Sequence, residues 1–114
     1  MTRYNKGDVI LVPFPFSDQT TTKKRPAVII SSDTYNNISQ DIVIMAITGQ
    51  TRSHIGIGEF LIEDWKGAGL LKSSAVKSAI STIDQRLVTK ILGRFSSKDL
   101  STLGKALKEL FDLR

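Results

Sequence analysis

Short runs of β-branched and other apolar residues, each ended by proline, glycine or a polar loop, constrain this chain more than any other feature. The first three runs cover residues 9–12, 27–30 and 42–47. Pro13 restricts the backbone at the end of the first run, and Pro26 opens the second, where it costs no ladder hydrogen bond. The third run is apolar almost throughout, which predicts a central strand that is buried on both faces.

The second half of the chain continues this pattern and then changes its period. Residues 60–62, 74–83 and 88–95 are expected to form further short strands, because their apolar residues alternate or cluster between turn signals. Within residues 100–111, leucines recur at steps of three and four, which is typical of an amphipathic helix. The segment around residues 35–37 is mostly polar and is expected to continue a loop.

The start of the expected helix carries two capping signals. Ser96 is a candidate N-cap, and Asp99 falls in the first turn, where a negative charge interacts favourably with the helix dipole. Gly104 weakens the helix by about 1 kcal/mol relative to alanine, unless close packing requires the missing side chain.

These elements predict a mainly β fold with minor α: a small, strongly bent sheet or partly closed barrel with a C-terminal helix. A length of 114 residues and 40% apolar content suit one domain, 1–114. The chain has no cysteine, its apolar runs are too short to span a bilayer, and its start lacks the apolar core of a signal peptide. We therefore expect a cytoplasmic protein with no membrane partner.

The charge balance leaves two interpretations open. Sixteen Lys and Arg against eleven Asp and Glu give a formal net charge of +5. Such a balance favours polyanionic partners such as nucleic acids, but it equally describes a basic protein that its charge keeps soluble. Composition alone does not choose between them.

The sequence lacks the residues that several common kinds of catalytic or binding site require. His54 is the one histidine, and Glu109 with Asp112 has no evident third ligand, so neither a metal site nor a cofactor is expected. No Gly-flanked serine accompanies His54 as a nucleophile signature. Residues 56–58 carry two glycines but lack the lysine and helix of a phosphate-binding loop.

What remains is guanidinium and hydroxyl chemistry at strand ends. Metal-free RNA cleavage requires proton transfers at the 2′-hydroxyl and the leaving 5′-oxygen, and stabilisation of charge on the phosphorane. Arg25 and Thr48 suit the last task, since each borders an apolar strand that would hold its side chain rigidly. The alternative is that Arg25 is an ordinary surface residue and Thr48 a strand-terminating hydroxyl.

Several sequence blocks together resemble a known family. Residues 7–12, the polar loop after them and residues 24–31 (Lys-Arg-Pro-Ala-Val-Ile-Ile-Ser) are similar to the opening of PemK/MazF toxins of type II toxin–antitoxin modules. Ala46-Ile47-Thr48 and residues 81–87 (Ser-Thr-Ile-Asp-Gln-Arg-Leu) agree with that family in order and spacing. The blocks extend over nearly the whole chain, so the match is specific.

The resemblance implies an SH3-like barrel of the CcdB/PemK type that forms a homodimer. It implies a growth-inhibiting mRNA interferase: a metal-independent, sequence-specific endoribonuclease that cuts single-stranded RNA and leaves 2′,3′-cyclic phosphate and 5′-hydroxyl ends. Family members are silenced by a cognate antitoxin whose extended tail occupies the RNA groove, and they would reach operator DNA only through it. The family pattern makes Arg25 and Thr48 the catalytic pair.

The RNA-binding prediction covers four residues of the loop before and beside Arg25, and one lysine near the middle of a later strand: Asp18, Gln19, Lys23, Lys24 and Lys77. For Lys77 the alternative is an ordinary outward-facing, solvated lysine. Many ribonucleases of the family carry a Gly-Ser-Glu-Gln type loop before the Arg-Pro block. This chain has no glutamate there, so Asp18 and Gln19 are the candidate substitutes, and the general base is not identified.

Two other functions follow from the same residues. The altered loop and the basic charge also suit a non-catalytic module on the same barrel that binds nucleic acid or a protein partner. A toxin directed at DNA gyrase is a more distant alternative, because such poisons act through a C-terminal tryptophan. Trp65 is the one tryptophan here, and its expected role is to cover the barrel edge or to contact a second protomer.

Overall fold

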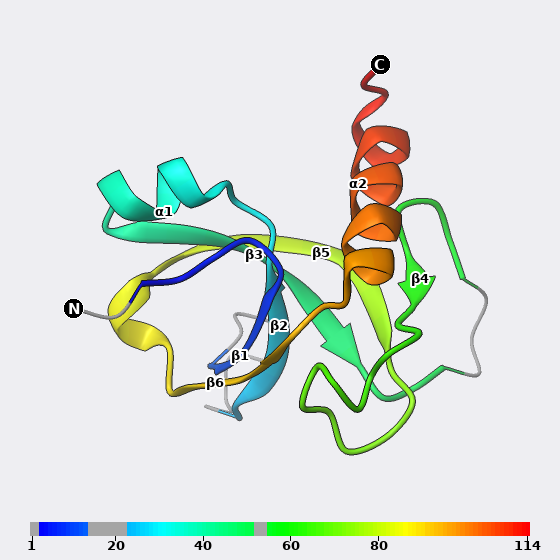
Figure 1. Cartoon of the computed structure of the whole chain (residues 1–114), viewed down its shortest axis with the longest axis horizontal. Coiled ribbons are helices and arrows are strands. Elements are labelled where there is room, and N and C mark those ends of the chain that lie inside the picture. The colour runs from blue at the N-terminus through cyan, green and yellow to red at the C-terminus, as the bar shows by residue number, and fades with distance from the viewer. Residues whose placement is uncertain (1–2, 14–22, 52–54) are drawn as a thin grey trace.

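The computed structural model describes residues 3–13, 23–51 and 55–114, and all structural statements below concern these residues. Six strands, two α-helices and a short 3-10 helix form the described part of the chain (Figure 1). In chain order they are β1 (Asp8–Val12), β2 (Arg25–Ile29), α1 (Asp33–Ile38), β3 (Asp41–Thr48), β4 (Phe60–Leu61), β5 (Ala75–Asp84), η1 (Gln85–Leu87), β6 (Lys90–Arg94) and α2 (Ser97–Phe111).

The strands form one antiparallel sheet in the order β4-β5-β3-β2-β1-β6. The pairing register between β3 and β5 shifts along the sheet: Met45 pairs with Ile80, but Ile47 pairs with Val76. Between these two pairs β5 spans four residue steps and β3 only two. Extra residues on one strand of a pair form a β-bulge, which bends that strand and increases its twist. The sheet curls into a half-barrel (Figure 1). The expected class, mainly β with a strongly bent sheet and a C-terminal helix, is confirmed.

The sheet is buried on both faces because alternate residues of its central strands point to opposite sides. One cluster lies on the α2 side and contains Val9, Val28, Met45, Ile47, Phe60, Ile62, Ala68, Leu70, Val76, Phe95 and Leu103. The other contains Ile10, Val12, Ala27, Ile29, Ile42, Ile44, Ala46 and Ile83. The prediction that the run at 42–47 is a central strand buried on both faces is confirmed.

Helix α2 begins and packs as its sequence indicates. The Ser96 hydroxyl accepts a hydrogen bond from the Asp99 backbone N–H, which confirms the predicted N-cap. Leu103 is fully buried in the core, and Leu100, Leu107 and Leu110 pack against the same cluster. Phe111 belongs to the same sequence stripe but is 54% exposed, because it is the last residue of the helix.

Helix α1 contradicts the loop expected around residues 35–37. The Ser32 hydroxyl caps this short helix by accepting a hydrogen bond from the Tyr35 N–H. Asn36 is buried, and its amide donates to the carbonyls of Tyr4 and Ser31. The polar sequence hid the helix because capping and one buried asparagine stabilise it, instead of an apolar stripe.

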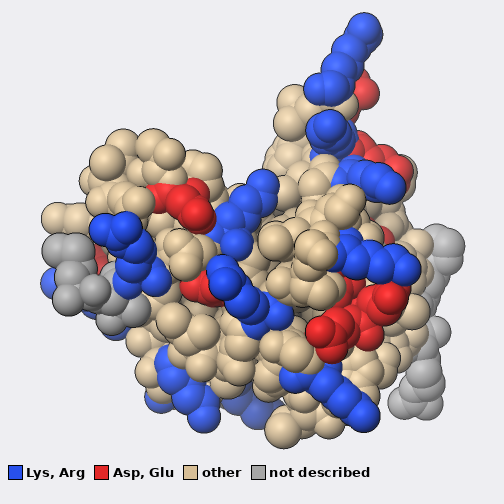
Figure 2. All heavy atoms as spheres, viewed as in Figure 1, with Lys and Arg blue, Asp and Glu red and all other residues tan. Residues whose placement is uncertain are grey.

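On the face drawn in Figure 2, charged side chains are spread out and do not form one patch. Figure 2 shows Lys and Arg along α2 and across the lower part of the visible face, with Asp and Glu between them. The net charge therefore does not by itself locate a site on this face. No helix in the described ranges is both long and apolar enough to cross a membrane.

Candidate functional site

Arg25 and Thr48 lie at the same end of two neighbouring strands. Arg25 is the first residue of β2 and Thr48 the last of β3, and these strands run antiparallel. Ala27 pairs with Ala46, and each candidate residue lies two positions beyond that pair. Continued by two residues, this register would set Arg25 opposite Thr48, although they are 23 positions apart in the sequence.

The Thr48 hydroxyl keeps one hydrogen-bonding function for a ligand. Its oxygen accepts a hydrogen bond of 3.1 Å from the backbone N–H of Gln50, which stabilises the turn after β3. A hydroxyl that accepts through a lone pair still carries a hydrogen to donate. Thr48 is half-buried, and on its other side β3 pairs with β5 at Ala75. The strand-terminating role and the donor role are therefore compatible.

Arg25 is exposed and lies on a well-supported strand. Its backbone pairs with Val12 of β1, while β3 lies on the opposite side of β2. Lys23 and Lys24 precede it and are also exposed, so three cations follow one another at the start of β2. Asp18 and Gln19, the other predicted RNA-binding residues of this loop, lie outside the described residues.

Lys77 lies on β5, where the ladder to β3 shifts, and its ammonium has a partner within the protein. Its Nζ is 3.4 Å from Oε2 of Glu59, and its side chain is 42% exposed. The predicted RNA-binding lysine is therefore half-exposed and ion-paired, in a segment next to β4.

Glu59 holds the loop before β4 against β5. Its carboxylate accepts hydrogen bonds from the Gly56 N–H, at 3.0 Å, and from both the N–H and the hydroxyl of Ser78. Burial alone would raise the pKa of Glu59, but these backbone hydrogen bonds and the charge of Lys77 outweigh it and lower the pKa. Glu59 is thus an ionised structural carboxylate whose acceptors are occupied.

Sequence reasoning missed Lys72, which lies against the residue that follows Thr48. A Cβ atom placed on Gly49 would come within 2.2 Å of Cε of Lys72 and 3.1 Å of its Nζ. The lysine side chain therefore covers Gly49, the residue directly after Thr48. The signal in the sequence is a glycine at a strand end, which permits close approach but does not say what approaches.

A cavity lies away from these residues, at the opposite end of β3. Its volume is about 510 Å³, and its walls comprise Arg3, Asn36, Asn37, Ser39, Gln40, Asp84, Gln85 and Arg86. The Gln85 amide donates to the carbonyls of Asn36, Ser39 and Asp41, which ties η1 to the end of α1. The block at residues 81–87 thus has a structural role here.

Trp65 is half-buried and packs against the core cluster on the α2 side, with Nζ of Lys66 5.5 Å from its ring centre. Its expected roles, covering the barrel edge or contacting a second protomer, stay predictions. His54 lies outside the described residues. Among residues 3–13, 23–51 and 55–114, no three His, Cys, Asp or Glu side chains form a group that could hold a metal ion.

Solved structures of similar fold are toxins and endoribonucleases. An endoribonuclease from a mycobacterial species, solved with its cognate antitoxin, is 16% identical over 100% of this chain and 98% of its own, with a TM-score of 0.76. The toxin MazF-mt6 of Mycobacterium tuberculosis is 19% identical over 94% and 98%, with a TM-score of 0.74. MazF from Deinococcus radiodurans is 18% identical over 99% and 100%, with a TM-score of 0.76.

Family membership follows from the sequence itself. A search of curated proteins found no match. Residues 5–111, however, match the model of PemK-like, MazF-like toxins of type II toxin–antitoxin systems. This range covers nearly the whole chain and includes Arg25 and Thr48. The chain therefore belongs to the family of PemK-like, MazF-like toxins.

Proposed function

We propose that this chain is a metal-independent, sequence-specific endoribonuclease toxin that cleaves single-stranded RNA. Membership of the toxin family supports the proposal, as does a fold shared with proteins described as endoribonucleases. The observation that carries it is that Arg25 begins β2 and Thr48 ends β3, at the same end of two antiparallel neighbouring strands. A guanidinium and a hydroxyl donor on rigid strands suit a phosphodiester that gains charge during reaction.

The proposed reaction is an internal transfer at phosphorus. The ribose 2′-oxygen loses its proton and bonds to phosphorus, and the bond from phosphorus to the 5′-oxygen of the next nucleotide breaks. The 5′-oxygen takes up a proton, so the products are a 2′,3′-cyclic phosphate and a 5′-hydroxyl. Arg25 anchors the phosphate or assists proton transfer, and Thr48 donates a hydrogen bond to the charged phosphorane.

The proposed RNA path runs along the start of β2 and over β5. Lys23 and Lys24 are exposed cations next to Arg25, and such lysines position a backbone through its phosphates. Lys77 would interact with both Glu59 and an RNA phosphate, because its Nζ already lies 3.4 Å from Oε2 of Glu59. Asp18 and Gln19 remain predicted RNA contacts of the preceding loop.

We further propose that residues 1–114 act as one toxin domain, in the cytoplasm, as a homodimer and under control of a cognate antitoxin. Structures described as MazE–MazF complexes from Deinococcus radiodurans support an antitoxin partner, since their folds match this chain with TM-scores of 0.74 and 0.75. Operator DNA would be reached only through that antitoxin.

The decisive experiment is cleavage of a long single-stranded RNA by the purified protein in EDTA, with and without Arg25→Ala. We expect the wild type to cut at a short recurrent sequence and the variant to leave the RNA intact. Arg86→Ala is the matched control, because it removes an exposed guanidinium near the opposite end of β3. Analysis of the new ends should find a 5′-hydroxyl and a cyclic phosphate.

Three outcomes would contradict the proposal. RNA that stays intact at high protein concentration excludes the activity, and salt-sensitive binding without cleavage would then identify a binding module. Cleavage that Arg25→Ala leaves unchanged would reject the assigned pair. Cleavage that requires an added metal ion would reject metal independence.

A further inference from the structure

A lysine from a different segment lies against Gly49, the residue that follows the proposed catalytic Thr48. The Lys72 side chain lies directly against Gly49, since an alanine Cβ at this position would be only 2.2 Å from Cε of Lys72. Gly49 follows Thr48 directly, so the Lys72 side chain reaches the end of β3. The contact joins two parts of the chain that are 23 positions apart.

The backbone at Lys72 is held by Ser74, the residue that leads into β5. The Ser74 hydroxyl donates a 2.8 Å hydrogen bond to the Lys72 carbonyl, and Ser74 itself is only 4% exposed. The Ser74 carbonyl accepts from the Ile62 N–H, and Ala75 pairs with Thr48. The stem of Lys72 therefore starts from a fixed point, three residues before the partner of Thr48.

The charge of Lys72 has no counterion in the described part of the chain. Lys77 and Lys98 each form an ion pair with a glutamate, at 3.4 and 2.9 Å, whereas no such pair involves Lys72 among residues 3–13, 23–51 and 55–114. Lys72 is also exposed. A hydrated ammonium of this kind is a point charge that binds phosphate oxygens through three rotatable donors.

The strand order places cations on both sides of Thr48. Strand β2, which begins at Arg25, lies on one side of β3, and β5, which follows Lys72, lies on the other. We propose that Lys72 binds a phosphate of the single-stranded RNA on the β5 side of Thr48. This inference rests on the proposed function, because it deepens the description of the same site.

Binding at several salt concentrations tests the proposal directly. The ligand is a single-stranded RNA with 2′-O-methyl groups, which cannot undergo the transfer reaction and stays intact during the measurement. Each neutralised phosphate contributes about 0.7 to the slope of log affinity against log salt for single strands. We expect Lys72→Met to weaken binding at low salt and to reduce that slope by about 0.7, whereas Lys72→Arg retains it.

Lys66→Met is the matched control. Lys66 is likewise an exposed lysine, but it lies over the Trp65 ring, and the atoms nearest to the Cβ position of Gly49 all belong to Lys72. Its replacement should leave both affinity and slope unchanged. A Lys72→Met protein with the wild-type slope would overturn the proposal, and so would an equal change in Lys66→Met.

Gly49→Ala provides an independent test that retains every charge. The added methyl group displaces the Lys72 side chain, because the Cβ position overlaps with its Cε. We expect Gly49→Ala to weaken binding in the wild-type background but to have no further effect in Lys72→Met, since both changes act through one contact. Fully additive effects would overturn the proposed contact.

Cleavage of unmodified RNA separates this proposal from the proposed function. A protein that binds with the expected change of slope but never cleaves supports the Lys72 contact and rejects the ribonuclease. A protein that cleaves through Arg25 while Lys72→Met binds and cleaves like the wild type rejects the Lys72 contact alone.

Discussion

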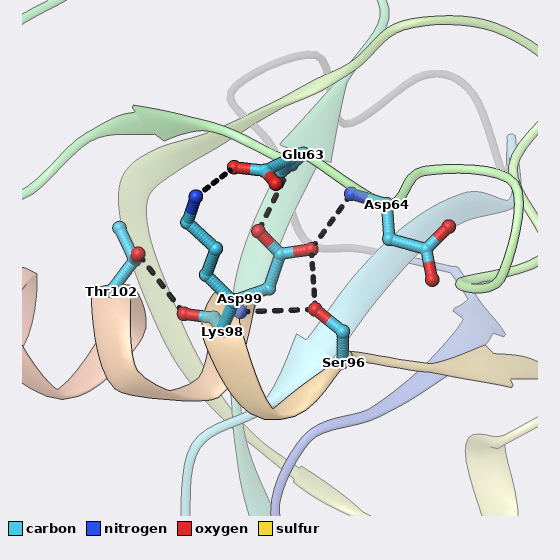
Figure 3. Close-up of polar contacts among 6 residues, drawn as sticks. All are labelled: Glu63, Asp64, Ser96, Lys98, Asp99 and Thr102. Atoms are coloured by element: carbon cyan, nitrogen blue, oxygen red, sulfur yellow. Dashed lines mark hydrogen bonds and ion pairs between the residues drawn. The ribbon is translucent and has the colours of Figure 1, made fainter.

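The carboxylate of Asp99, in the first turn of α2, accepts a 2.9 Å hydrogen bond from the backbone N–H of Asp64, which is 35 positions earlier in the chain (Figure 3). The other carboxylate oxygen accepts from the Glu63 N–H, also at 2.9 Å. The Ser96 hydroxyl donates a further hydrogen bond to the Asp99 carboxylate, and Asp99 is only 1% exposed. This carboxylate therefore joins the start of α2 to the segment after β4.

We predict that Asp99→Asn destabilises the protein by about 2–3 kcal/mol. An amide in this position turns its NH₂ group toward a backbone N–H, so a buried donor loses its acceptor and a charge-assisted hydrogen bond is lost. Urea unfolding gives the free energy of unfolding, with an unchanged slope if the native state stays compact. Asp112→Asn, at the exposed C-cap of α2, should change stability by less than about 0.5 kcal/mol. Equal effects of the two changes would reject this account of Asp99.

Two glycines should respond to alanine with opposite signs. Gly69 has a φ of +78°, and a Cβ there would lie 2.0 Å from the Leu92 carbonyl oxygen. We expect Gly69→Ala to destabilise by about 3 kcal/mol through backbone strain and overlap. A Cβ at Gly104 meets no atom within 4 Å apart from its own helix backbone, among the described residues. Gly104→Ala should therefore stabilise α2 by about 1 kcal/mol. Thermal melting of both variants checks the two signs, and a destabilised Gly104→Ala would show an unexpected packing constraint.

The pair formed by Asp84 and Arg86 should be visible in an acid titration. The side-chain and backbone hydrogen bonds from Arg86 lower the pKa of Asp84 from an ordinary 3.8 to about 2. Because the folded-state pKa lies below the unfolded value, the pair stabilises the fold above about pH 3.8. That contribution disappears as the pH falls toward 2.

Arg86→Ala should raise the pKa of Asp84 part of the way to its ordinary value, because the backbone N–H of residue 86 remains as a donor. Titration of the carboxyl carbon by NMR measures this change. The same variant should lose stability at neutral pH but not near pH 2. Arg94→Ala is the control, since Arg94 pairs with Asp8 instead; a shifted Asp84 titration in that variant would argue against a local cause.

Thr48 offers a pair of substitutions that separate stability from activity. Thr48→Ser keeps the hydroxyl that accepts from the Gln50 N–H and should retain most of the RNA cleavage. Thr48→Val removes the hydroxyl and should lower the free energy of unfolding by about 1 kcal/mol. The same valine variant also loses the donor to the phosphorane, which should lower kcat by about a hundredfold or more. Single-turnover cleavage of RNA measures the second effect. A valine variant as active as the serine variant would remove Thr48 from the proposed mechanism.

Strand positions were predictable because each strand is a local pattern. The apolar runs that became β1, β2 and β3 lie where the sequence indicates, and the serine cap of α2 lies at Ser96. Helix α1 was not predictable from periodicity. Its stability comes from the Ser32 cap and from the buried amide of Asn36, whose partner Tyr4 is distant in the sequence. Such contacts leave no regular spacing of apolar residues.

The candidate site was likewise predictable only in part from the sequence. Arg25 and Thr48 were recognisable from their sequence blocks, but only the antiparallel pairing of β2 with β3 sets their two strand ends side by side. The approach of Lys72 to Gly49 was not visible in the sequence, because a glycine permits a close contact without specifying its partner. The sequence by itself thus determined the strands, the terminal helix and the residue types available for phosphate chemistry. The tertiary structure decided which of those residues meet, since strand order and curl set distances that no local pattern contains.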